Sequence, residues 1–64
     1  MHNLLSVTVD RVQNVVQQNG SVTLSQLETI LDTSFNLIFL AIDKLSRENK
    51  IHIKRGGRDY VLSR

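Results

Sequence analysis

The residues best suited to chemistry in this 64-residue chain are the basic side chains of its last third. Residues 44–64 contain seven Lys or Arg against two Asp or Glu, a net charge of +5, whereas residues 1–43 contain one basic and four acidic residues, a net charge of −3. This charge distribution is typical of a small nucleic-acid-binding domain, because phosphates attract Lys and Arg. The alternative interpretation is an ordinary solvated surface.

The sequence offers little for catalysis or for a metal site. It contains no Cys, which excludes disulfides and thiolate metal ligands within these residues. The two His residues, His2 and His52, have neither Cys nor clustered carboxylates as companion ligands. Catalysis needs titratable groups that converge in a pocket, and the acidic residues here are scattered singly. We therefore expect a binding protein without enzymatic activity, cofactor or metal.

The length predicts a single domain over residues 1–64. A chain this short buries only about 60% of its unfolded surface, so oligomerisation is a natural source of extra stability. No apolar run approaches the ~20 residues of a membrane span. The start at Met1 has no signal-peptide pattern, and we expect a cytoplasmic protein.

A first helix is predicted over residues 3–19. Asn19-Gly20 favours a stop there, because Gly adopts the left-handed conformation that ends many helices. The apolar residues at helical spacing, which we expect to face the core, are Leu5, Val9, Val12 and Val16.

Two further helices follow, separated by the polar turn Thr33-Ser34. The second is predicted from a capping box, with Thr23 as N-cap and Gln26 reaching back to it, to about Asp32. The third is predicted from Ser34 as N-cap to about Asn49. The expected core residues are Leu24, Leu27, Ile30 and Leu31 in the second helix, and Ile38, Ala41, Ile42 and Leu45 in the third, with Phe35 at its edge.

A β-hairpin is predicted at the C-terminal end, with Gly56-Gly57 as a two-residue type I′ turn. Val22 could add a short third strand. The cross-strand pairs expected in this register are Arg55 with Arg58, Lys54 with Asp59, Ile53 with Tyr60, His52 with Val61 and Ile51 with Leu62.

Residues 38–51, IFLAIDKLSRENKI, resemble the recognition helix of a winged helix domain running into its wing. The element order is similar to that of short stand-alone prokaryotic winged helix-turn-helix proteins, from about Ser6 to Leu62. The resemblance implies a mainly α fold of three helices with a two- or three-stranded wing. It also implies DNA binding, with the third helix in the major groove and the wing along the backbone.

The third helix departs from what that resemblance implies. Its groove-facing positions by analogy would be Asn36, Leu37, Leu40 and Lys44, and two of these are Leu. Leucine can neither donate to nor accept from a base edge, and the neighbouring Asp43 would repel phosphate. Leu37, Phe39 and Leu40 could instead form an apolar patch of a few hundred Å², the usual mark of an interface.

Two functions are therefore expected as alternatives. The first is nucleic-acid binding, as of duplex DNA by a transcription regulator, in which the basic wing makes most of the phosphate contacts. The second is a protein-interaction module that homodimerises or docks a partner through Leu37, Phe39 and Leu40. The candidate nucleic-acid-binding residues are Asn36, Lys44, Arg47, Lys54, Arg55 and Arg58.

Overall fold

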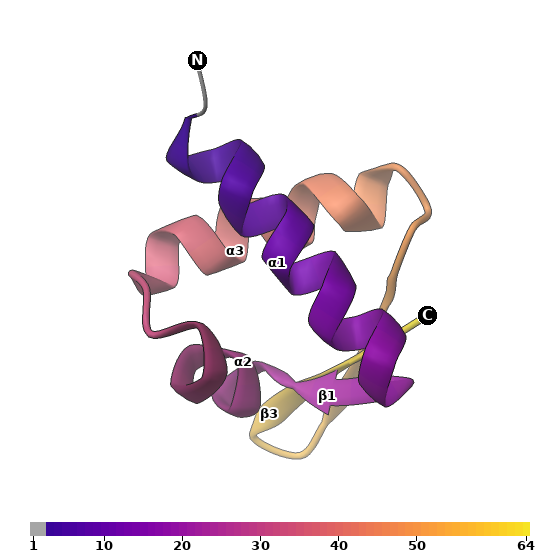
Figure 1. Ribbon diagram of the computed structural model, residues 1–64. Coiled ribbons are helices and arrows are strands. Elements are labelled where there is room, and N and C mark those ends of the chain that lie inside the picture. Colours follow the sequence, from indigo (N-terminus) through magenta and orange to yellow (C-terminus); the bar gives the residue numbers. More distant parts are fainter. Residues whose placement is uncertain (1–2) are drawn as a thin grey trace.

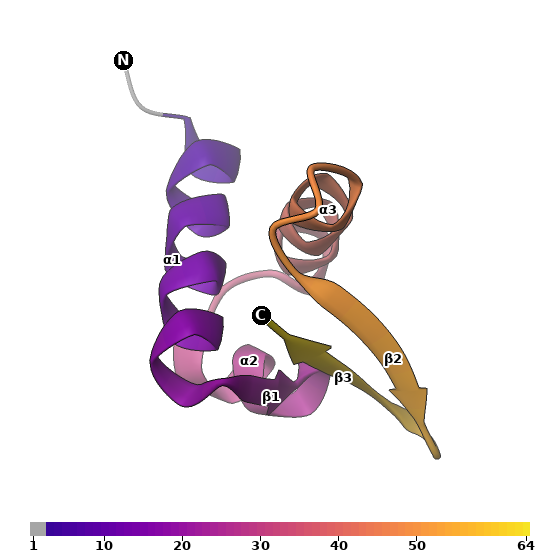
Figure 2. The same ribbon diagram turned by 90° about the vertical axis from the view of Figure 1, so that its right-hand side faces the viewer.

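The computed structural model describes residues 3–64 and has the winged helix-turn-helix arrangement of three helices and a small antiparallel sheet (Figure 1). In Figure 2, α1 lies at the left, and the hairpin of the last two strands extends away from it toward the lower right. The elements in chain order are α1 (Leu4–Asn19), β1 (Ser21–Thr23), α2 (Leu24–Leu31), α3 (Phe35–Arg47), β2 (His52–Gly56) and β3 (Asp59–Ser63).

Helix α1 begins and ends where its capping residues place it. The Asn3 side chain accepts a hydrogen bond from the backbone N–H of Ser6 at 2.7 Å, so Asn3 is the N-cap. At the other end Gly20 has φ +80° and donates its N–H to the Val16 carbonyl at 2.8 Å. The predicted helix over residues 3–19 is confirmed to within one residue.

Helix α2 has the predicted capping box. The Thr23 hydroxyl accepts from the Gln26 backbone N–H at 3.1 Å, and the Gln26 side chain accepts from the Thr23 N–H at 2.9 Å. Asp32, in the left-handed region at φ 47°, ends the helix, and Arg11 of α1 donates to the Leu31 carbonyl at 3.2 Å. Helix α2, the short turn that ends at the N-cap Ser34, and α3 together form the helix-turn-helix unit, as expected.

Three details of the predicted helices are wrong. Ile30 was expected in the core but is half exposed, because the face that α2 buries is the narrow one around Leu24, Leu27 and Leu31. Phe35, expected at the core edge, is also half exposed. Helix α3 ends at Arg47 rather than near Asn49, which has the left-handed φ of 60°.

The sheet has the order β1-β3-β2, with both neighbouring pairs antiparallel (Figure 2). The short strand expected at Val22 is present as β1, and Val22 pairs with Leu62. Strand β3 is therefore central. It pairs with β2 on one side and, on the other, with β1, the short strand between α1 and α2. We call the β2–β3 hairpin, residues 52–63, the wing.

The predicted register of the wing is wrong by two residues. Ile53 pairs with Leu62 and Arg55 with Tyr60, so the turn is Gly57-Arg58. Gly57 has φ +65° whereas Arg58 has no positive φ, the sign pattern of a type II′ turn. Because strand side chains alternate with a period of two, this shift keeps every residue on its predicted face and changes only its partner.

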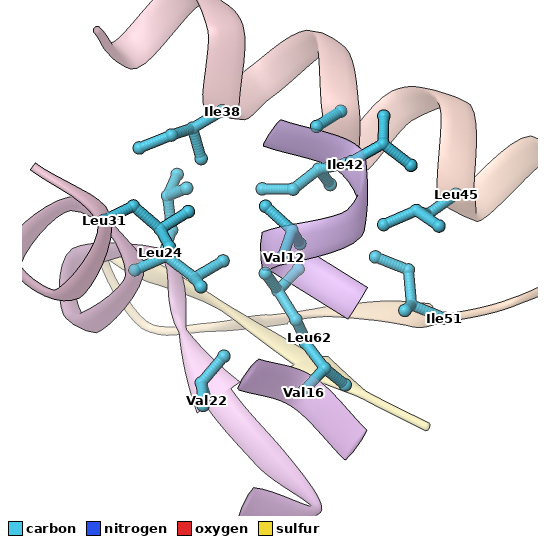
Figure 3. Close-up of a cluster of buried hydrophobic side chains, with 13 residues drawn as sticks. Val12, Val16, Val22, Leu24, Leu31, Ile38, Ile42, Leu45, Ile51 and Leu62 are labelled. Atoms are coloured by element: carbon cyan, nitrogen blue, oxygen red, sulfur yellow. The ribbon is translucent and has the colours of Figure 1, made fainter. Parts of the chain in front are cut away.

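The core lies where α1, the inner face of α3 and the central strand meet (Figure 3). Helix α1 packs mainly on α3, and Leu62 brings β3 into the same cluster. Leu5, expected in the core, is only partly buried against it. The fully or almost fully buried apolar residues are Val9, Val12, Val16, Val22, Leu24, Leu27, Leu31, Ile38, Ala41, Ile42, Leu45, Ile51 and Leu62.

Candidate functional site

The outward face of α3 is exposed, as its periodicity predicts. The helix starts at Ser34, whose Oγ accepts a hydrogen bond from the Leu37 N–H at 3.3 Å. Burial of the face around Ile38 and Leu45 then directs the opposite face to solvent. The residues that it presents are Asn36, Leu40, Asp43, Lys44 and Arg47.

Acidic neighbours neutralise the cations of α3. Lys44 Nζ lies 2.9 Å from Glu48 Oε2, and Arg47 Nε lies 3.2 Å from Asp43 Oδ2, both at the helical i,i+4 spacing. The hydrogen bond and the charge of Lys44 hold the pKa of Glu48 below its usual value. These four side chains sum to zero charge, which weakens the attraction of this face for phosphate.

The wing carries three exposed cations, Lys54, Arg55 and Arg58, and no ion pair among residues 3–64 involves them. The expected pair of Lys54 with Asp59 is not formed, because Lys54 lies opposite Val61 in the observed register. Lys54 and Arg55 point to opposite faces of the hairpin, and Arg58 lies in its turn. The three charges therefore surround the tip of the wing, and Asp59, the acidic residue next to Arg58, forms no ion pair with them in residues 3–64.

An apolar groove separates α3 from the wing. It has a volume of about 150 Å³, and its side chains come from α2, α3 and both strands of the wing. Phe39, Ile53 and Tyr60 are each 41–53% exposed, so they form the rim, whereas the other lining residues are buried. The groove is lined by Leu24, Phe39, Ile42, Ile53, Tyr60 and Leu62.

The three residues of the predicted apolar patch lie in different surroundings. Phe39 lines the groove, and its ring stacks on that of Phe35, with centroids 5.9 Å apart and planes at 22°. Leu37 is half-buried and lies about 200° around the helix from Phe39, on the opposite flank. Leu40 is exposed on the outward face between them. Ile53 and Tyr60, which complete the groove with Phe39, were not among the predicted site residues.

The described residues hold no group of three His, Asp or Glu side chains that could bind a metal ion. His52 is exposed on β2, and His2 lies outside the described residues. Among residues 3–64, no helix has the length and apolar character needed to cross a membrane.

The chain matches no family model, no curated protein and no solved structure in the three comparisons with known proteins.

Proposed function

We propose that this protein is a non-catalytic winged helix module that binds duplex DNA through contacts of its wing with the phosphate backbone. The observation that supports this most strongly is the division of charge between the two candidate elements. Lys44 and Arg47 of α3 are paired with acidic residues, whereas none of the ion pairs found in residues 3–64 involves a cation of the wing. Unpaired cations at a projecting tip can approach phosphate without first losing an internal partner.

The wing has few means to read a base sequence. Its cations point in different directions around a Gly-containing turn, which suits contacts along a backbone better than bidentate contacts with one base. On α3, Asn36 is the exposed side chain best able to read a base edge. We therefore expect binding with strong salt dependence and weak sequence preference.

The test is fluorescence anisotropy of a labelled duplex over a series of salt concentrations. Each phosphate neutralised contributes about −0.9 to the slope of log affinity against log salt, so three wing cations give a slope of roughly −2.7. Lys54→Gln, Arg55→Gln and Arg58→Gln should each make the slope shallower by up to about 0.9.

The matched control is the double substitution Lys44→Gln and Arg47→Gln, which removes two exposed cations that are already paired. We expect this variant to keep the salt slope of the wild type. A duplex that does not bind the wild-type protein even at low salt would contradict the proposed function. If the control variant made the salt slope shallower by as much as the wing variants do, that result would contradict the role of the wing.

A further inference from the structure

Four large apolar side chains lie together on one exposed face of the domain. Phe39, Ile53 and Tyr60 form the rim of the groove, and Phe35 extends this surface by stacking on Phe39. Each of the four is between 41% and 53% exposed. We call these four residues and the groove between them the groove face.

The groove is too small for an ordinary small-molecule ligand. Its volume of about 150 Å³ is below the roughly 300–1,000 Å³ of most ligand pockets. It is close to the volume of cavities that accept a single benzene ring. The occupant that fits is therefore one apolar side chain, presented by a larger surface that covers the rest of the face.

The apolar area of the groove face matches what a protein interface requires. A half-exposed aromatic side chain presents roughly 100 Å², so the three aromatic residues and the smaller Ile53 together offer somewhat less than roughly 400 Å². One partner of a standard interface contributes about 800 Å², of which roughly 500 Å² is apolar. The groove face thus supplies most of the apolar surface that one side of a stable dimer needs.

The same face contains both an exposed ring and a hollow. The Phe35 ring stands beside the groove without lining it, and the groove has room for one ring. A two-fold axis brings identical surfaces together, so a surface that holds both parts can be complementary to itself. The charges of α3 do not oppose this, because Asp43 with Arg47 and Lys44 with Glu48 are neutral pairs within each chain. The exposed cation beside this face is Arg55, which lies opposite Tyr60 across the hairpin.

Another surface open to self-association is the edge of β2, and its charges disfavour it. Antiparallel pairing of two β2 edges about the middle residue of the strand would place Lys54 opposite its own copy. Like charges directly opposite each other destabilise a strand pair, and Lys on an edge strand commonly prevents such pairing.

We propose that two copies of this chain form a symmetric homodimer through the groove face, with Phe35 of each copy in the groove of the other. This inference concerns the apolar groove face and not the cations of the wing tip, and it does not depend on DNA binding. It gives the domain the additional burial that a chain of 64 residues lacks as a monomer.

The test is sedimentation equilibrium without nucleic acid, on the wild-type chain and on Phe39→Glu, over about 10 μM to about 1 mM protein. We expect a wild-type dimer and at least a roughly 30-fold rise in the dissociation constant for Phe39→Glu, as for a residue at the centre of an interface. Ile30→Glu is the matched control, because Ile30 is 51% exposed but lies on α2 away from the groove lining.

Circular dichroism shows whether each variant is folded. Should Phe39→Glu unfold, Ile53→Ser is the second variant, and the same weakening of the dimer is expected. In the wild type, backbone amide signals of Phe35, Ile53 and Tyr60 should shift with concentration, whereas that of Ile30 should not. A wild-type chain that is monomeric at about 1 mM would overturn the proposal. A dimer weakened equally by Ile30→Glu would overturn its location.

Discussion

The carboxylate of Asp59, at the start of β3, lies beside the hydroxyl of Ser25 in the first turn of α2. The Ser25 hydroxyl is the largest reason that the pKa of Asp59 lies below its ordinary value of 3.8. The Tyr60 backbone N–H, at 2.8 Å, and the first backbone amides of α2 act in the same direction. A negative charge at a helix N-terminus is favourable, so this contact links the base of the wing to α2.

This contact predicts a pH dependence of stability. Because the folded-state pKa is below the unfolded value, the ionised carboxylate stabilises the fold above the unfolded pKa, and this contribution is lost as the pH falls through the folded pKa. Asp59→Asn should therefore lose less stability than the wild type between about pH 7 and about pH 3 in urea unfolding. Asp10→Asn, on the exposed side of α1, is the control. Equal acid sensitivity of wild type and Asp59→Asn would contradict the role of the contact.

The two glycines of the wing should respond differently to substitution. Gly57 has φ +65°, so Gly57→Ala should destabilise the fold by about 1–2 kcal/mol. Gly56 has no positive φ, and a Cβ there would lie 3.4 Å from Val61 Cγ2, so Gly56→Ala should change stability by less than about 0.5 kcal/mol. Chemical denaturation of both variants measures the difference. Similar losses at both positions would favour the type I′ turn in which both glycines have positive φ.

The sequence predicted the elements of the fold but not the pairing within the wing. Caps identify helix ends through local hydrogen bonds, which is why Thr23 with Gln26 and the Gly20 stop could be located without a structure. The register depends on which residues occupy the turn, and Gly56-Gly57 and Gly57-Arg58 are both acceptable turns. The two registers bury the same face, so hydrophobic alternation could not decide between them.

Ile30 and Leu62 provide a test of the core, because both are large apolar residues but only Leu62 is buried. Leu62 is fully buried and pairs with both Val22 and Ile53, so Leu62→Ala should cost about 2–5 kcal/mol. That is a large part of the stability available to so small a domain. Ile30 is 51% exposed, and Ile30→Ala should change stability by less than about 1 kcal/mol. Thermal unfolding followed by circular dichroism compares them, and comparable losses would place Ile30 in the core.

The candidate site was less predictable than the fold, because it depends on contacts between distant segments. The outward face of α3 follows from helical periodicity, and the exposed positions of Asn36 and Lys44 were foreseen. The groove requires the distance between α3 and the wing, which no local pattern contains. One signal was present: Ile53 and Tyr60 are apolar residues on the same face of the hairpin as Leu62, and Tyr60 lies nearer to the turn.

The paired charges of α3 allow a test of which element lies on the DNA. The double substitution Asp43→Asn and Glu48→Gln removes both acidic partners and changes the charge of this face from zero to +2. Exposed pairs of this kind contribute at most about 1 kcal/mol, so the fold should persist. Lys44 and Arg47 then have no acidic partner at i,i+4. If the wing alone contacts phosphate, the salt slope of this variant should stay within about 0.5 of the wild-type slope. A slope steeper by roughly 1.8 would place α3 against the duplex and contradict binding through the wing alone.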